Sequence, residues 1–432
     1  MNVALAGLWH LGCVTAAGLA RAGHRVTVYD PDPETRESVK RGKAPLFEPE
    51  LDEALAEGLR SGRLAVADSP AALLAGADLL WVTFDTPVRD DDTADTAFVR
   101  NAILGLLPHV GPGLLVLVSS QLPAGSIRAL EADADRTLPG RGLRFACSPE
   151  NLRLGQALAC FMKPDRIVGG VRAEADKAPL AELWKPLGCP VEWMTVESAE
   201  MTKHAINAFL ALSVTFANEL ATLCEKAGAD GREVERGLKT EARIGPKAYL
   251  RPGRAFDGGT LARDVLFLAG LGSEAGLPLQ LIPSIQRANE SHKGWLLRVT
   301  AEALAGLPRP VVAVLGLAYK PGTDTLRRST ALEFCRAAAG RGWRVQAYDP
   351  LVRALPPGDS ALHLCPDIRT ACAGADALVV ASDCPEFKAV PRADWLAWAE
   401  GKCVVDPARH LFEHVGRAAG VRYRAVGLKG GL

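Results

Sequence analysis

The chain has 432 residues, which is too long for one compact core, so two or three domains are expected. Apolar residues make up 48% of it, and 50 lysines and arginines balance 50 aspartates and glutamates. This balance argues against a nucleic-acid-binding protein, and the lack of a run of about 18 consecutive apolar residues argues against a membrane span.

The N-terminus and the cysteines indicate the compartment. Met1 and Asn2 run directly into a strand-like segment without a basic region or a cleavage signal, so no secretion is expected. The ten cysteines are scattered, with no CxxC pair and no metal-like pairing with histidine. Reduced thiols in a cytoplasmic protein without a metal site are therefore expected.

The chain begins with a pattern typical of a dinucleotide-binding βαβ unit. A buried strand ends in the glycine turn of residues 7–12, a helix follows, and a second strand ends at Asp30. Such a turn points backbone N–H groups at a pyrophosphate, and a carboxylate after the second strand binds ribose hydroxyls and favours NAD over NADP. The residues expected to bind NAD are Gly7, Trp9, His10, Leu11, Gly12 and Asp30.

Trp9 occupies the position of the middle glycine in this fingerprint. That glycine normally lets the backbone approach the phosphates, so an indole is expected to push the cofactor outward or to fill part of its site. The alternative is a Rossmann-like domain that no longer binds a dinucleotide.

Further strands are expected at residues 79–83, 114–118 and 166–168, and a long helix over residues 198–226. Ser198 is its predicted N-cap, and apolar positions nearly all round the helix predict that it is buried.

Lys203 and Asn207 are one turn apart on this helix and share a face, which suits stabilisation of an alkoxide. The alternative is a solvated lysine beside a surface asparagine.

The opening pattern recurs near the end of the chain. Residues 312–317 form a strand followed by a glycine, and residues 342–350 form a second strand that ends in aspartate. An additional polar loop at residues 319–329 follows the first of these strands. We expect an α/β fold with two Rossmann-like, doubly wound parallel-sheet domains joined by a long central helix. The expected boundaries are residues 1–196, 197–300 and 301–432.

Two motifs resemble the UDP-glucose/GDP-mannose 6-dehydrogenase family. They are the helix segment of residues 202–209 and the glycine loop of residues 256–264, and the family's motif order extends from Gly7 to Arg409. In that family the glycine loop ends in a cysteine that forms a thiohemiacetal and then a thioester, with an aspartate four residues later. Here the aspartate is Asp264, whereas Thr260 stands in place of the cysteine.

The resemblance also implies further site residues. Glu150 matches a glutamate with a general acid/base role, while Leu154 replaces a second glutamate and Gln121 replaces a threonine near the hydrolytic water. The implied cofactor-edge residues are Thr86, Ser120, Gln121 and Arg327. The implied nucleotide-sugar ligands, some of which are alternatively only solvated side chains, are Arg243, Tyr249, Leu250, Lys320 and Arg409. A homodimer through the central region, with the arginine often lent by the second subunit, and a nucleotide-sugar-binding C-terminal domain are likewise implied.

The departures from the family pattern predict an altered reaction. Lys203, Asn207, Asp264 and Glu150 suit one hydride transfer, but the Thr260 hydroxyl is a weak nucleophile without an adjacent base. The chain is therefore expected to be an NAD-dependent oxidoreductase acting on a CH–OH group of a nucleotide-sugar by a two-electron or transient oxidation. Transient oxidation would give a net epimerisation or dehydration. The alternatives are a conventional four-electron 6-dehydrogenase and a non-catalytic nucleotide-sugar-binding protein.

Overall fold

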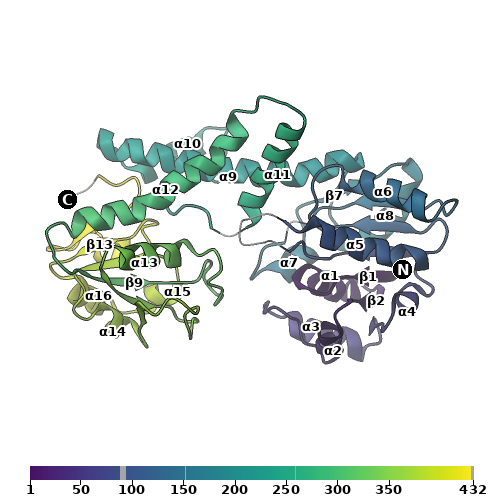
Figure 1. The fold of residues 1–432 in the computed structure, drawn as a ribbon, viewed down its shortest axis with the longest axis horizontal. Helices are drawn as coiled ribbons and strands as arrows, with labels where there is room; N and C mark the ends of the chain where they lie inside the picture. The colour runs from purple at the N-terminus through teal and green to yellow at the C-terminus, as the bar shows by residue number, and fades with distance from the viewer. Residues whose placement is uncertain (88–93, 151, 258, 430–432) are drawn as a thin grey trace. The chain divides into compact units, whose positions relative to one another are not determined.

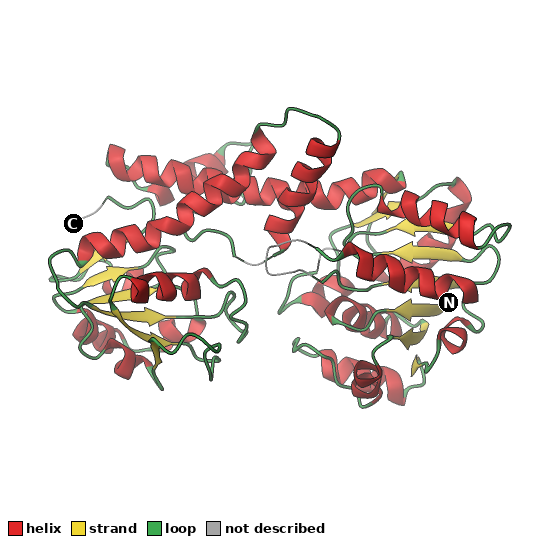
Figure 2. Ribbon diagram, in the orientation of Figure 1, coloured by secondary structure: helices red, strands yellow, loops and turns green. Residues whose placement is uncertain are grey.

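The computed structural model describes residues 1–87, 94–150, 152–257 and 259–429. The chain divides into two compact units, Met1–Ile206 and Asn207–Leu432, and each contains one parallel or mostly parallel sheet covered by helices (Figures 1 and 2). The α/β architecture with two sheets and a long helix is therefore confirmed.

The first unit is built on an eight-stranded sheet in the order β3-β2-β1-β4-β5-β6-β7-β8. All neighbouring strands pair in parallel except β6 and β7, which are antiparallel. The three further strands expected from the sequence are present as β4, β5 and β7. The strands are β1 Asn2–Ala6, β2 Arg25–Tyr29, β3 Leu64–Val66, β4 Leu79–Val82, β5 Leu115–Val118, β6 Arg144–Cys147, β7 Ile167–Gly170 and β8 Val191–Met194.

Helices cover both faces of this sheet because the central strands are apolar on both sides. Val3 and Leu5 of β1 belong to one hydrophobic core, and Ala4 and Ala6 belong to the other. The helices are α1 His10–Arg21, α2 Pro33–Lys40, α3 Leu51–Arg60, α4 Pro70–Leu74, α5 Thr96–Leu106, α6 Ser126–Thr137, α7 Ala157–Met162 and α8 Lys177–Trp184, with short 3₁₀ turns at Leu107–His109, Glu174–Asp176 and Lys185–Leu187.

The strand order reverses between β1 and β4. In doubly wound sheets ligands bind at the carboxyl ends of the strands beside such a reversal. This edge carries the glycine turn after β1, residues 83–87 after β4, and the loop of residues 119–125 after β5. The fold thus places the predicted cofactor loops along one edge of the sheet.

The second unit repeats the pattern with a six-stranded parallel sheet in the order β11-β10-β9-β12-β13-β14. The predicted internal repeat is confirmed, since β9 and β10 correspond to β1 and β2. The strands are β9 Val311–Leu315, β10 Arg344–Tyr348, β11 Leu362–Leu364, β12 Ala377–Val380, β13 Cys403–Val405 and β14 Arg422–Arg424. The helices are α10 Gly231–Thr240, α11 Thr260–Glu274, α12 Leu281–Ala303, α13 Thr330–Gly340, α14 Ile368–Cys372, α15 Pro385–Ala389, α16 Arg392–Ala399 and α17 Phe412–Val415.

The long helix is α9, Val196–Ala227, and it differs from the prediction in two ways. Ser198 is not its N-cap, because the helix begins two residues earlier and the Thr195 hydroxyl accepts the Ser198 N–H at 3.3 Å. The helix is also not buried all round, since the apolar side chains of Phe209, Phe216 and Leu223 are exposed. By length and composition α9 would suffice to cross a membrane, a test that core helices of soluble proteins also pass.

Candidate active site

The turn between β1 and α1 has room only for glycine at two of its positions. Gly7 has a φ of +101°, and a Cβ added there would lie 2.6 Å from the Phe84 backbone nitrogen. A Cβ at Gly12 would lie 1.7 Å from the Gly7 carbonyl oxygen. The turn therefore packs directly against the end of β4 and against the first turn of α1.

Trp9 fits this turn without backbone strain. Its φ is −79°, which any residue adopts, and 47% of the residue is exposed. The indole therefore lies at the surface of the turn and does not distort the backbone. Leu11 is buried in the core, so only its backbone is suited to a cofactor contact.

Asp30 accepts two backbone hydrogen bonds at the end of β2. Its Oδ2 accepts the Leu8 N–H at 2.7 Å, and its Oδ1 accepts the Asp32 N–H at 3.0 Å. Burial raises the pKa of the Asp30 carboxyl, and these N–H groups oppose the shift. Because each oxygen accepts one backbone bond from the described residues, lone pairs remain for ribose hydroxyls.

The equivalent residue of the second unit, Asp349, has different hydrogen-bond partners. It is buried and accepts four backbone N–H groups, two on each carboxylate oxygen. These bonds fix the loops after β9 and β10 and leave little capacity for a ribose. The dinucleotide site is thus supported in the first unit, where the glycine turn and Asp30 fit the cofactor.

His10 is held by a buried carboxylate that sequence reasoning missed. Its Nε2 lies 3.0 Å from Glu48 Oε2, and Glu48 also accepts the Gly155 and Ala157 N–H groups, each at 2.8 Å. Glu48 therefore joins the start of α1 to the start of α7. The role of His10 toward the cofactor stays a prediction.

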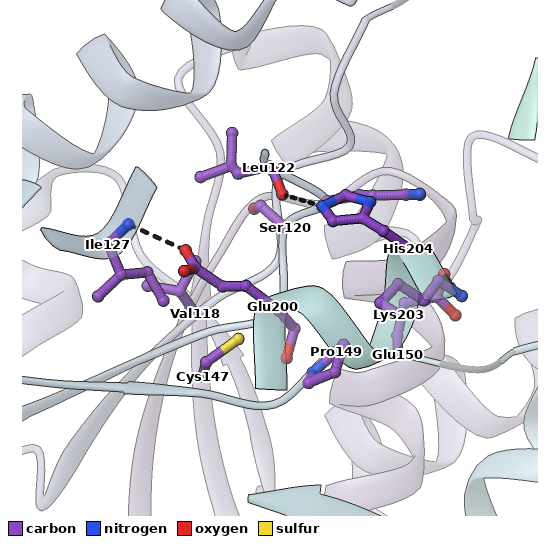
Figure 3. A pocket seen from close by; sticks show the side chains of 12 residues that line it. Val118, Ser120, Leu122, Ile127, Cys147, Pro149, Glu150, Glu200, Lys203 and His204 are labelled. Carbon is purple, nitrogen blue, oxygen red and sulfur yellow. Dashed lines mark hydrogen bonds and ion pairs between the residues drawn. The ribbon is translucent and has the colours of Figure 1, made fainter. Parts of the chain in front are cut away.

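A pocket lies at the carboxyl ends of β5 and β6, beside the first turns of α9 (Figure 3). It contains four residues predicted from the sequence: Ser120, Gln121, Glu150 and Lys203. Lys203 Nζ lies 3.7 Å from Glu150 Oε1, so the predicted ammonium and carboxylate form an ion pair. The Ser120 hydroxyl is buried and has no hydrogen-bond partner among the described residues, as expected where a ligand supplies one.

Two helix residues that contact the pocket loop were not found from the sequence. The Glu200 carboxylate accepts the Gly125 N–H at 2.8 Å and the Ile127 N–H at 3.0 Å, and His204 Nε2 lies 3.0 Å from the Leu122 carbonyl oxygen. Burial raises the pKa of Glu200, while the two N–H groups lower it. Thr86, a predicted cofactor-edge residue, donates to the Gln121 carbonyl at 2.6 Å.

Cys147 is the thiol of this pocket, at the end of β6. Burial raises its pKa strongly, and the Glu200 carboxylate adds to the shift. The thiol is thus protonated at neutral pH and unsuited to nucleophilic attack.

The remaining catalytic candidates lie in the second unit. Asn207 Nδ2 donates to Asp264 Oδ2, and both side chains are buried. Thr260 is the first residue of α11 and is exposed, and Asp264 lies one turn further along the same helix. This unit thus places an amide, a carboxylate and a hydroxyl in the order that the motifs predict.

The predicted substrate cations are in varied environments. Arg243 is 88% exposed and pairs with Glu241 at 2.8 Å. Arg409 is half-buried and bonds to Asp230 at 2.7 Å and to the Gly427 carbonyl at 2.9 Å. Tyr249 and Arg327 are exposed, whereas Leu250 and Lys320 are half-buried. Their roles in substrate binding stay predictions.

Comparison with known proteins identifies the family to which the chain belongs. Profiles of the UDP-glucose/GDP-mannose dehydrogenase family match the NAD binding domain at residues 1–188, the central domain at residues 197–291 and the UDP binding domain at residues 313–413. The chain belongs to this family. It therefore has an NAD-binding domain, which confirms the predicted cofactor.

Relatives and solved structures match over nearly the full length. The UDP-glucose 6-dehydrogenase YwqF of Bacillus subtilis is 30% identical, over 99% of this chain and 98% of its own length. The UDP-glucose 6-dehydrogenase of Rhizobium meliloti is 34% identical over 90% and 91%. The structure of a UDP-glucose dehydrogenase from Pyrobaculum islandicum has a TM-score of 0.87 and 31% identity, covering 99% of this chain and 98% of that one. The chain is thus a member of an NAD-dependent nucleotide-sugar dehydrogenase family.

Proposed function

We propose that this chain oxidises a CH–OH group of a nucleotide-sugar with NAD and stops after two electrons, at the carbonyl. One observation carries the proposal. The residues suited to hydride transfer are retained, whereas position 260, at the start of α11, has a hydroxyl. A four-electron oxidation requires a nucleophile that holds the aldehyde covalently, and a hydroxyl near its ordinary pKa performs this step poorly.

The retained residues support one hydride transfer. Bound NAD supplies the hydride acceptor. The Lys203 ammonium and the second N–H of the Asn207 amide stabilise the alkoxide that develops on the substrate oxygen. Glu150, 3.7 Å from Lys203, takes up the hydroxyl proton. Asp264 orients the amide of Asn207 through its hydrogen bond.

The thiol among the described residues that line the pocket, Cys147, is a poor nucleophile. Cys147 is buried and its pKa is raised, so the thiolate is scarce at neutral pH. Gln121 adds a second difference, because it stands where the family resemblance places a threonine near the hydrolytic water. Formation of the thioester and its hydrolysis are therefore both weakened.

UDP-glucose is the first substrate to test, since the relatives named above are UDP-glucose 6-dehydrogenases by name. The family also includes GDP-mannose dehydrogenases in its description, so GDP-sugars belong in the same panel.

The NADH formed per nucleotide-sugar consumed tests the proposed function. With excess NAD, we expect one NADH per sugar, measured by absorbance at about 340 nm alongside chromatography of the sugar. Two NADH per sugar would overturn the proposal and establish the acid-forming 6-dehydrogenase despite Thr260. Sugar consumption without NADH would instead establish a redox-neutral epimerisation or dehydration, with the hydride returned within the cycle.

A homodimer through α9 is the proposed assembly. Phe209, Phe216 and Leu223 are exposed and spaced by seven residues, so they form one apolar stripe on the helix. A second copy of the chain is the partner that fits, because a stripe of this kind buries itself against its own copy in a two-fold contact. We expect sedimentation to give a dimer and Phe216→Glu to give a folded monomer. A wild-type monomer at micromolar concentration would contradict the proposal.

A further inference from the structure

We propose that Glu200 and His204 are positioning residues that set the nicotinamide-side loop, residues 119–125, relative to Lys203. The inference rests on the NAD-binding domain and on the role proposed for Lys203. It adds a function for two buried polar side chains that the hydride-transfer set does not use.

The loop forms the nicotinamide side of the cofactor edge. Asp30, at the end of β2, would bind the adenosine ribose, so the other half of a bound dinucleotide would lie across the strand reversal, on the side of β4 and β5. The loop follows β5, and its Ser120 and Gln121 line the pocket that also contains Lys203; Figure 3 shows Ser120 and Lys203 there.

The loop ends at the start of α6, where the first N–H groups of the helix need acceptors. Gly125 is the N-cap of α6 and has a φ of +93°, and as a glycine it has no side chain to cap the helix. The first N–H groups of a helix require an acceptor from elsewhere. Glu200 supplies it, with one carboxylate oxygen on the Gly125 N–H and the other on the Ile127 N–H. The negative charge also suits the positive end of the helix dipole.

His204 holds the same loop from its other side. Its Nε2 lies 3.0 Å from the Leu122 carbonyl oxygen, so this ring nitrogen carries the proton. The ring is almost fully buried, which keeps water from competing for the bond. Thr86 completes the arrangement by donating to the Gln121 carbonyl from the loop after β4.

The two tethers flank Lys203 on α9. Glu200 precedes it by three positions and His204 follows it directly, and all three residues line the pocket (Figure 3). A shift of α9 would therefore move the ammonium and the loop together. This shared support keeps the nicotinamide and the reacting carbon at a fixed separation, on which the rate of hydride transfer depends strongly.

Binding of NAD and of ADP-ribose to variants tests the proposal without a sugar substrate. In Glu200→Gln one of the two backbone bonds is lost, and we expect NAD affinity to fall about tenfold. ADP-ribose lacks the nicotinamide, so its affinity should change less than about twofold. Glu197→Gln is the control, because Glu197 lies on the same helix and pairs with the exposed side chains of Arg128 and Arg172. Isothermal titration calorimetry measures both ligands.

The His204 variants give an independent test if Glu200→Gln does not fold. His204→Gln keeps an N–H donor near the position of Nε2, whereas His204→Leu removes it. We expect the leucine variant to lose NAD affinity selectively and the glutamine variant to recover most of it. Equal losses for NAD and ADP-ribose, or unchanged NAD affinity in folded variants, would overturn the proposal. Neither binding result depends on the two-electron reaction. A failure of the proposed function would therefore be recognised separately, by the number of NADH formed per sugar.

Discussion

Replacing Thr260 by cysteine is expected to add a second hydride transfer, seen as one further NADH per enzyme molecule. The side chain starts α11, and a thiol at a helix N-terminus has a lowered pKa and an accessible thiolate. The thiolate adds to the aldehyde carbon as a thiohemiacetal, whose C–H then gives up a hydride to a second NAD to leave a thioester. Rapid-mixing absorbance measures the additional NADH, and intact-protein mass spectrometry detects the thioester.

The single variant is expected to stop at the thioester. Gln121 still stands in place of the threonine that the family resemblance puts near the hydrolytic water, so Thr260→Cys combined with Gln121→Thr should release acid with turnover. Thr260→Ser is the matched control, since it keeps a hydroxyl and should give no additional NADH. A Thr260→Cys protein that forms the aldehyde but no covalent adduct would show that more than the nucleophile is missing.

The fold was largely predictable because its signals are local. The two strand–glycine–helix–strand patterns ending in Asp30 and Asp349 identify both sheets without tertiary information. The N-cap of α9 was not predictable in this way. Thr195 and Ser198 both suit the position, and in the structure the helix begins at Val196 with the Thr195 hydroxyl accepting the Ser198 N–H, while Glu197 binds Arg128 and Arg172 from other parts of the first unit. Sequence spacing contains no information about such contacts.

Site residues that belong to a motif were predictable from the sequence. Residues whose hydrogen-bond partners are backbone groups were less predictable. Lys203, Glu150, Ser120 and Gln121 were named from motifs, and they line one pocket. The contacts of Glu200 were missed because the donors to its carboxylate are backbone N–H groups about 75 positions away in sequence, which no side-chain pattern reveals. Its only local signal is its position one turn before Lys203 on α9.

The equivalent aspartates of the two units show that similar sequence contexts can have different hydrogen-bond partners. Asp30 and Asp349 end equivalent strands and have equivalent sequence contexts. Four backbone donors occupy Asp349, whereas two occupy Asp30. The number of loop N–H groups that turn toward each carboxylate therefore separates a structural aspartate from a candidate ribose ligand, and this number depends on loop conformation.

Lys203→Met is expected to lower kcat by about 10²–10³-fold on the sugar that gives NADH with the wild-type protein. Methionine keeps much of the volume of the lysine stem but removes the charge that stabilises the alkoxide in the transition state. Because the alkoxide charge develops only during the reaction, KM for the sugar should change far less than kcat. Initial rates of NADH formation over a range of sugar concentrations separate the two constants.

The ion pair between Lys203 and Glu150 determines how a loss of kcat is interpreted. Glu150 lies 3.7 Å from the ammonium, so Lys203→Met leaves a carboxylate without its ion-pair partner, and part of any loss reflects that carboxylate. In a double-mutant cycle with Glu150→Gln, two groups that act on the same oxygen should give losses that are clearly less than multiplicative. Lys226→Met, at the exposed end of the same helix, should leave kcat unchanged. A Lys203→Met protein with kcat within threefold of the wild type would remove Lys203 from the reaction centre.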